Sequence, residues 1–452
     1  MNYVLEFYRP EGQFCLGPLL KQSGGMKGMG IKILGRISPF LATFAILVSA
    51  CGGRTAAPST APTASPAPPS YELWVVDQAE TTPTGGGTLY IYKGADLSGG
   101  APAPAYTVNL GEAALGVGDG IGKHGHSIAF HPAMTHAVIS YVDSGHVQVI
   151  RAADRKVVAS IKMTGSAAGP AAPHASAVTP AGDAIIVANQ GGKRLQRITA
   201  DFKNDVYKLD AAADLDLSLL EDADHPGNLP VIPVFTPDGR YVYVPMRGGG
   251  SYVVDYQATP MKTVATLGKS AIGPQSCCAA FVKDTVWTTA QGGATTTTTS
   301  FNLYQVTGLP DRPVAKKILS RTGNVESHSV ILVGQYLWLA DRFANTLDIV
   351  DQTGDARTIS LASGPLASRD PAPDIMAASP DESRVFVALR GKTPLTSNIK
   401  GLDNAVGDVG GFAILTVKDG GRDAVVSSVV ALPLAAGASV VDPHGLRIRI
   451  IK

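Results

Sequence analysis

The sequence predicts an all-β protein and, within that class, a seven-bladed β-propeller. One strand–turn–strand unit recurs seven times, each copy consists of short strands and turns, and the copies are spaced by roughly 45–70 residues. The three clearest copies read PHASAVTPAGDAIIVANQ from Pro173, PVIPVFTPDGRYVYVPMR from Pro230 and PDIMAASPDESRVFVALR from Pro373. Repetition at this period is typical of the blades of a propeller.

The remaining copies are weaker, and one of them is split between the two ends of the folded chain. HSIAFHPAMTHAVISYV begins at His126, PQSCCAAFVKDTVWTTAQ at Pro274 and HSVILVGQYLWLADR at His328. HGLRIRIIK from His444 ends the chain, whereas YELWVVDQ from Tyr71 begins the folded part. We therefore expect the C-terminal strand to pair with the N-terminal blade, because this closes the ring and removes an open sheet edge.

Aligned copies share a large apolar residue four positions before the end of the second strand. Because the first strands are rich in small residues, we expect them to be crowded at the axis. The large residues should fill the wedges between neighbouring blades. They are Trp74, Val138, Ile186, Tyr243, Trp287, Trp338 and Phe386.

Composition excludes some functional classes. Only 17% of the 452 residues are charged and the net charge is +1, which argues against a nucleic-acid-binding surface. Four cysteines are too few for a disulfide framework in a chain of this length.

The N-terminal region predicts export and lipid anchoring. Residues 26–50 read as a signal peptide, with basic residues before an apolar run that is too short to span a membrane. The segment Val48-Ser49-Ala50-Cys51 resembles the bacterial lipobox, which implies that Cys51 is lipid-modified; the alternative is an ordinary signal peptide cut near Ala50. Residues 1–25 are predicted to lie upstream of the true start codon.

A tether and a folded domain follow the signal peptide. Residues 51–70 contain the candidate lipidated cysteine and a stretch rich in Pro, Ala and Thr, which favours an extended spacer. Residues 71–452 are left for the propeller. We therefore expect an extracytoplasmic protein anchored by lipid to a bacterial membrane, in the periplasm, at the outer membrane or at the cell surface. Its small-molecule or protein partner is not identified, and no nucleic-acid partner is expected.

Two family resemblances rest on short motifs. VANQ from Val187 and VALR from Val387 resemble the repeat of YVTN-type seven-bladed propellers, which implies a scaffold used for binding, electron transfer or catalysis. HGHSIAF from His124 resembles the HxHS segment of lactonase-type propellers, which implies a lactonase-like enzyme with its site at the channel mouth. Those enzymes usually carry a glutamate at the end of a second strand, where the best-matching copy here has Asn189 and Gln190.

Strand direction locates a candidate site. If the first strand runs down and the second runs back up, the starts of first strands and the ends of second strands share one face of the ring. Four imidazoles at first-strand starts then converge on the channel mouth, and neutral imidazole suits copper or zinc. The alternative is that Pro-His simply recurs, with each ring bonded to neighbouring backbone. The four candidate metal ligands are His126, His174, His328 and His444.

Other polar residues are expected on the same face and could hold an anionic or polar organic ligand. These candidate ligand-binding residues are Arg247, Arg342, Arg390, Asp341, Asp374 and Gln275. The sequence therefore predicts a scaffold that binds a ligand or a protein through this face. The alternative is a metal-dependent (Cu or Zn) or lactonase-like enzyme, and no catalytic residue is assigned.

The remaining cysteines and histidines are given structural roles. Successive side chains of a strand point to opposite faces, so Cys277 and Cys278 are expected to be two small buried hydrophobes. The alternative, a disulfide between adjacent cysteines, would need a distorted backbone. The histidines expected to be solvated in turns or at strand edges are His131, His136, His146 and His225.

Overall fold

A computed structural model describes residues 69–98, 102–291, 299–363, 369–396 and 405–451. The upstream segment 1–25, the predicted signal peptide, Cys51 and the tether as far as residue 68 lie outside the described residues. Among the described residues, no helix combines the length and the apolar character needed to cross a membrane.

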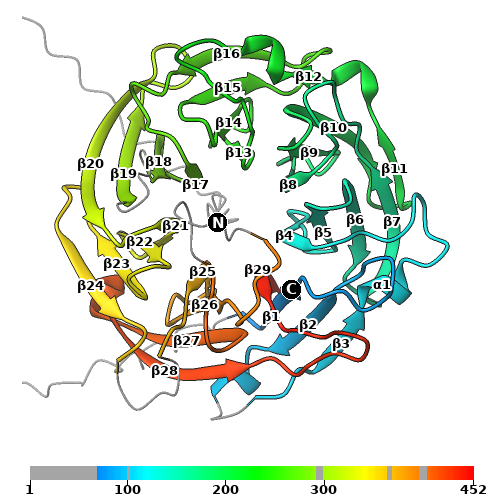
Figure 1. Cartoon of the computed structure of the whole chain (residues 1–452), viewed down its shortest axis with the longest axis vertical. Helices are drawn as coiled ribbons and strands as arrows, with labels where there is room; N and C mark the ends of the chain where they lie inside the picture. The colour runs from blue at the N-terminus through cyan, green and yellow to red at the C-terminus, as the bar shows by residue number, and fades with distance from the viewer. Residues whose placement is uncertain (1–68, 99–101, 292–298, 364–368, 397–404, 452) are drawn as a thin grey trace, which may run out of the picture. The chain divides into compact units, whose positions relative to one another are not determined.

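Seven antiparallel sheets stand around a central axis (Figure 1), which confirms the seven-bladed β-propeller. Each sheet is called a blade and is numbered in chain order, with its innermost strand given first. Blade 1 contains β29 (Pro443–Ile450), β1 (Tyr71–Asp77), β2 (Thr88–Lys93) and β3 (Tyr106–Asn109). Blade 2 contains β4 (Gly125–Phe130), β5 (His136–Tyr141), β6 (His146–Arg151) and β7 (Lys156–Lys162). Blade 3 contains β8 (Pro173–Val178), β9 (Ala184–Asn189), β10 (Arg194–Asp201) and β11 (Val206–Leu209), with the short strand β12 (Leu215–Asp216) paired to β10.

The other four blades follow the same order from the axis outward. Blade 4 contains β13 (Val234–Phe235), β14 (Val242–Pro245), β15 (Ser251–Asp255) and β16 (Lys262–Leu267). Blade 5 contains β17 (Ser276–Val282), β18 (Thr285–Ala290), β19 (Thr299–Thr307) and β20 (Val314–Gly323). Blade 6 contains β21 (Ser327–Val333), β22 (Tyr336–Asp341), β23 (Thr346–Val350) and β24 (Ala356–Ser360). Blade 7 contains β25 (Pro373–Ala378), β26 (Arg384–Leu389), β27 (Gly411–Lys418) and β28 (Asp423–Ala431).

Helices in the described ranges are single turns in the connections. The helix α1 begins where the Asn109 side chain accepts hydrogen bonds from the backbone N–H groups of Gly111 and Glu112. The short helices are η1 (Asp96–Ser98), α1 (Leu110–Ala113), η2 (Ala211–Ala213), η3 (Leu217–Leu220) and η4 (Asp419–Gly421).

Turns between the first and second strands are fixed by their own side chains. In blade 4, Asp238 Oδ1 accepts hydrogen bonds from Thr236 Oγ1 at 2.6 Å and from the backbone N–H of Arg240 at 3.1 Å. Gly239 then adopts a φ of 69°, a left-handed conformation that glycine takes without steric cost. Such turns keep the two inner strands adjacent and antiparallel. The first strand therefore begins at the same end of the channel in each blade.

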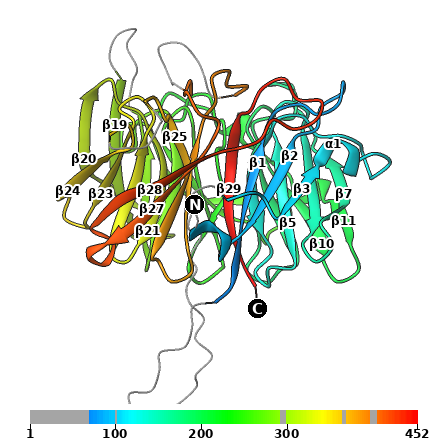
Figure 2. The same cartoon turned by 90° about the horizontal axis from the view of Figure 1, so that it is seen from below.

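The ring closes as predicted, through the C-terminal strand. β29 is antiparallel to β1, with Val75 opposite Leu446, Leu73 opposite Ile448 and Tyr71 opposite Ile450. Figure 2 shows that β1 begins and β29 ends at one end of the ring. His444, near the start of β29, therefore lies toward the other end.

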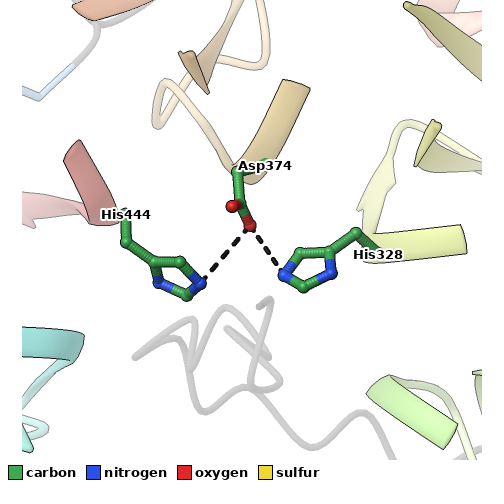
Figure 3. Close-up of side chains that lie close together, drawn as sticks. All are labelled: His328, Asp374 and His444. Atoms are coloured by element: carbon green, nitrogen blue, oxygen red, sulfur yellow. Dashed lines mark ion pairs between the residues drawn. The ribbon is translucent and has the colours of Figure 1, made fainter. Parts of the chain in front are cut away.

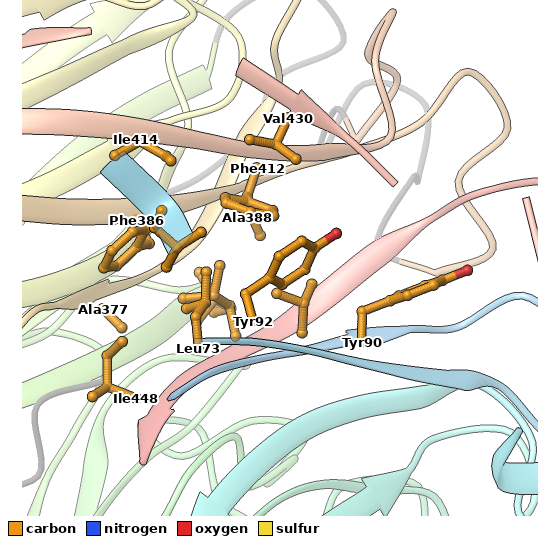
Figure 4. Close-up of a cluster of buried hydrophobic side chains, with 14 of the residues drawn as sticks. Leu73, Tyr90, Tyr92, Ala377, Phe386, Ala388, Phe412, Ile414, Val430 and Ile448 are labelled. Carbon is orange, nitrogen blue, oxygen red and sulfur yellow. The ribbon is translucent and has the colours of Figure 1, made fainter. Parts of the chain in front are cut away.

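Seven hydrophobic clusters, one for each contact between neighbouring blades, form the core. Figure 4 shows the cluster between blades 1 and 7, where Leu73 and Tyr92 pack near Phe386 and Phe412. Each predicted column residue belongs to a different cluster and is at most 1% exposed, which confirms that the column fills the wedges. They are Trp74, Val138, Ile186, Tyr243, Trp287, Trp338 and Phe386.

Candidate functional site

A β-bulge recurs near the start of six innermost strands, at the channel mouth. In blade 2, for example, Gly125 pairs with Tyr141 and Ser127 pairs with Ser140, so His126 is left over between them. A bulge re-aims the extra side chain, and here it turns one residue per blade toward the axis. We call these six residues the channel ring: His126, His174, Cys277, His328, Asp374 and His444. In blade 4 the corresponding repeat position holds the apolar Val231.

Gln275 is not the start of the first strand of blade 5, as the alignment assumed. β17 begins at Ser276, and Gln275 has a φ of 58°, the same as that of His124 in blade 2. His124 precedes its ring residue by two positions, so the ring residue of blade 5 is Cys277. The alignment was shifted because the Pro274-Gln275 pair was matched to the Pro-His start of other copies. Gln275 still lies at the mouth, where its Oε1 accepts a hydrogen bond from Arg247 Nε at 3.0 Å.

Three of the four predicted imidazoles lie in direct contact. The Nε2 atoms of His126 and His174 are 3.1 Å apart, and the ring centroids of His126 and His444 are 3.6 Å apart. His174 Nδ1 donates to the Val231 carbonyl at 2.9 Å, and His444 Nδ1 donates to the His126 carbonyl at 2.5 Å. Because each Nδ1 holds the proton, each Nε2 keeps a lone pair. His444 Nε2 has no hydrogen-bond partner among the described residues.

The fourth imidazole, His328, is paired with a buried carboxylate (Figure 3). His328 Nε2 lies 2.7 Å from Asp374 Oδ1, and His444 Nε2 lies 3.5 Å from the same oxygen. The ligand atoms of these three residues all lie within 4.8 Å of one another. Cys277 Sγ lies 3.8 Å from His328 Nδ1 and 4.0 Å from His328 Nε2. The His328 ring therefore lies between the carboxylate and the thiol of the channel ring.

Burial sets the charge of the imidazoles. Desolvation lowers the pKa of His174 to about 3 and holds the pKa values of His126 and His444 well below their usual range. His328 differs: burial and the Arg342 charge lower its pKa, but the Asp374 carboxylate and Cys277 outweigh them and raise it to about 9. At neutral pH, the imidazoles of His126, His174 and His444 are therefore uncharged, and each has one nitrogen lone pair that can bind a metal ion.

Two of the three predicted arginines are buried in ion pairs. Arg342 contacts Glu326 and lies 3.4 Å from Asp374 Oδ2, whereas Arg390 lies 2.9 Å from the same oxygen and 2.7 Å from Asp442 Oδ1. Both guanidiniums are at most 1% exposed. Their charge is thus balanced inside the protein. Arg247 is only partly buried and holds Gln275, as described above.

Glu326 and Asp442 are site residues that sequence reasoning missed. Both are fully buried, and each stands two positions before a ring histidine, in the sequences Glu-Ser-His328 and Asp-Pro-His444. An acidic residue at that offset in two copies was the available signal. Asp341, predicted as a ligand-binding residue, caps the loop that carries Glu326, because its Oδ1 accepts the backbone N–H groups of Glu326 and Ala344, both at 2.9 Å.

We expect the Asp341→Asn variant to become more stable than the wild type as pH rises. Burial raises the pKa of Asp341 to about 7. Because this value exceeds the unfolded value of about 4, the stability that the protonated form contributes is lost as pH rises from about 4 through 7, up to about 4 kcal/mol. Asn keeps the oxygen acceptor but does not ionise. Urea unfolding at pH 5 and pH 8 measures the difference.

Asp351 supplies the matched control for this pH dependence. It also caps backbone N–H groups, but at the surface, and the Thr353 hydroxyl lowers its pKa. The Asp351→Asn variant should therefore lose stability relative to the wild type at pH 8 rather than gain it. Equal pH slopes for the wild type and Asp341→Asn would contradict the prediction.

The described residues leave little room around the channel ring. One cavity of about 10 Å³ is lined by His126, His174, Cys277, His328 and His444, among others. An adjoining cavity of about 20 Å³ is lined by His174, Gln275, Cys277 and Arg342, among others. Each volume is close to that of one water-sized probe. The space therefore suits an ion with one solvent molecule better than an organic ligand.

Described residues after Arg390 lie at the same mouth. Thr396 Oγ1 donates to Gln78 Oε1 at 2.9 Å and lies 3.4 Å from His126 Nδ1. The backbone N–H of Leu395 donates to Asp442 Oδ2 at 2.7 Å. This segment therefore helps to orient His126 and to cover the network below it.

All the polar atoms of the Asn189 side chain form hydrogen bonds within the protein. Lactonase-type propellers usually carry a glutamate at this position. Its Oδ1 accepts the backbone N–H groups of Ala172 at 2.8 Å and Gly192 at 3.2 Å. Its Nδ2 donates to the Thr164 carbonyl and to Gln196 Oε1, both at 2.8 Å. This side chain is therefore structural.

Two of the four histidines expected in solvent are buried, so that prediction was wrong for them. His136 is 4% and His146 is 7% exposed. His136 Nε2 lies 3.0 Å from Asp205 Oδ1, and its ring packs against Phe202. His146 Nε2 donates to the Asp119 carbonyl at 3.2 Å. Partners from neighbouring loops cover both rings, which periodicity within one copy does not reveal.

Comparisons with known proteins extend the description of the fold. No protein-family model and no curated protein matches the chain. Similar solved structures include a hypothetical selenium-binding protein from Sulfolobus tokodaii, at 12% identity and a TM-score of 0.60, covering 85% of this chain and 94% of that one. The periplasmic gluconolactonase of Pseudomonas aeruginosa is similar at 15% identity and a TM-score of 0.54, covering 85% of this chain and 100% of that one. A protein from Lactobacillus plantarum is similar at 12% identity and a TM-score of 0.55, covering 85% and 100% of the two chains. At these identities the similarity shows the fold alone.

Proposed function

We propose that this chain is a lipid-anchored, extracytoplasmic propeller that holds one copper or zinc ion in its channel ring. The observation that carries the proposal is the orientation of three imidazoles. His174 Nδ1 and His444 Nδ1 each donate to a fixed carbonyl, and His328 Nε2 lies 2.7 Å from Asp374 Oδ1. Of the second nitrogens, His444 Nε2 has no hydrogen-bond partner among the described residues, whereas His174 Nε2 lies 3.1 Å from His126 Nε2. Anchoring the second nitrogen in this way is typical of histidines that bind metals.

The surrounding charges favour an ion over an anionic or lactone ligand. Arg342 and Arg390 are already paired with carboxylates, so they support the ring and do not offer an open cationic surface. A cavity of about 10 Å³ holds an ion more readily than a sugar lactone. Neutral imidazole donors suit copper and zinc, whereas magnesium and calcium prefer oxygen.

The ends of β1 and β29 indicate where the proposed lipid anchor would lie relative to the channel mouth. The folded chain begins at Tyr71, beside the end of β29, whereas His444 lies toward the start of that strand. A lipid on Cys51 would therefore attach through the tether at the end of the ring opposite the channel mouth. An extended tether of this length could reach roughly 60 Å, at about 3.1 Å per residue.

Metal analysis of the complete chain tests the proposal. We use the Cys51→Ser form, which cannot be lipidated, and expect about one equivalent of bound copper or zinc after loading and desalting. The double variant His174→Ala with His444→Ala should retain less than about a tenth of that ion, because two fixed nitrogen donors are lost. Absence of bound metal from the folded parent protein would end the proposal.

Two controls separate the site from general histidine binding and test the anchor. His131 lies in the turn after β4 and His225 near a surface aspartate, so His131→Ala with His225→Ala should leave the metal content unchanged. In cell fractions, the wild type should sediment with membranes and Cys51→Ser should not. Sedimentation of both forms would refute the lipid anchor without touching the metal site.

A further inference from the structure

Cys277 occupies the ring position that histidine holds in four other blades. The bulge in β17 places Cys277 and Cys278 together opposite Thr289, between the pairs Ser276 with Ala290 and Ala279 with Thr288. Cys277 is partly exposed and lines both cavities, whereas Cys278 is 1% exposed and packs in the core between blades 5 and 6. The expectation of two buried hydrophobes is therefore met by Cys278, whereas Cys277 is only partly buried: it packs against the same cluster and also lines the cavities.

Cys277 lies within reach of a histidine of the channel ring. Its Sγ is 3.8 Å from His328 Nδ1 and 4.0 Å from His328 Nε2, so the sulfur lies beside the imidazole. A sulfur at about 2.3 Å and a nitrogen at about 2.0 Å from one tetrahedral ion would be roughly 3.5 Å apart. The separation therefore suits a shared ion, and a rotation of the imidazole would turn a ring nitrogen toward it.

The second sulfur is in direct contact with the first. Cys278 Sγ lies 2.9 Å from Cys277 Sγ. A bound cation deprotonates a coordinating thiol outright and releases the proton.

We propose that Cys277 supplies a thiolate ligand to the ring ion, together with His328, and that the site therefore selects a thiophilic ion, monovalent copper or zinc. Cys278 is a positioning residue. This inference rests on the proposed function, because it names a ligand for the same ion. Sulfur beside imidazole excludes the hard cations magnesium, calcium and manganese as the preferred occupant.

X-ray absorption at the metal edge tests the inference directly. The complete Cys51→Ser chain is loaded under a non-thiol reductant with one equivalent of copper(I) or, separately, zinc(II). We expect one sulfur at about 2.3 Å beside nitrogen ligands for at least one of the two ions. Cys277→Ser should lose the sulfur signal and bind that ion more than about tenfold more weakly. Cys278→Ser should keep the sulfur signal.

The outcomes separate this inference from the proposed function. A loaded wild-type protein with nitrogen but no sulfur ligands would overturn the Cys277 assignment and leave the imidazole site standing. Failure of the wild type to bind either ion would overturn both. A sulfur signal that survives Cys277→Ser but disappears in Cys278→Ser would also overturn the assignment. If a variant fails to fold, a wild-type spectrum without a sulfur ligand still overturns the assignment.

Discussion

Replacement of Asp374 by Asn is expected to destabilise the ion-free protein by at least about 3 kcal/mol. Asp374 is fully buried, and its carboxylate contacts His328, Arg342 and Arg390. Burial alone would raise its pKa, but the cationic neighbours hold that pKa well below its usual range. Asn preserves the volume and removes only the charge, so the loss comes from uncompensated buried cations and not from a cavity. Urea unfolding of the metal-free protein measures the effect.

Asp355 provides the exposed counterpart. Its carboxylate lies 2.7 Å from Arg422, as close as the buried pairs, but the two side chains are 61% and 56% exposed. Solvent screens such a pair, so Asp355→Asn should cost less than about 1 kcal/mol. If both variants lost the same small amount, the buried network would not stabilise the channel end of the propeller.

The ring of seven blades could be predicted because the same pattern of residues recurs in each copy. Trp74, Trp338 and Phe386 share one position in their copies, and an apolar column of this kind has only the wedges between blades to fill. Closure followed from the split copy, since the strand after His444 lacks a partner unless it joins Tyr71–Asp77. The convergence of the four imidazoles followed in turn from strand direction, which alternates regularly within a blade.

What sequence reasoning missed depends on local register and on which charges meet in the folded chain. The bulge that points Cys277 into the channel shifts the register by a residue, and no residue type in Ser276–Ala279 indicates it. Arg342 pairs with Glu326, just before the first strand of the same blade, whereas Arg390 pairs with Asp442, just before β29 of the next blade. The second pair is formed by packing between blades, which an alignment of copies does not contain.

Deletion of residues 443–452 should abolish cooperative folding. The deletion removes β29, exposes the edge of β1 and takes Leu446 and Ile448 out of the core between blades 1 and 7. Two buried aliphatic side chains are worth about 2–5 kcal/mol each, and the lost ladder adds about 0.5–1.5 kcal/mol per hydrogen bond. Their sum is comparable with the whole stability of a typical protein, about 5–15 kcal/mol. Circular dichroism during heating should therefore show no sharp transition.

Moving the same segment tests whether closure, and not chain length, is responsible. Because Ile450 lies opposite Tyr71 in an antiparallel pair, residues 443–450 can be placed before Tyr71 through a short hairpin turn. This permuted chain, ending at Asp442, should regain a cooperative transition, and removal of residues 451–452 alone should have little effect. A truncated protein that melts within a few degrees of the wild type would show that six complete blades and a three-stranded blade 1 hold the ring without β29. The channel ring would then depend on β29 only for the imidazole of His444.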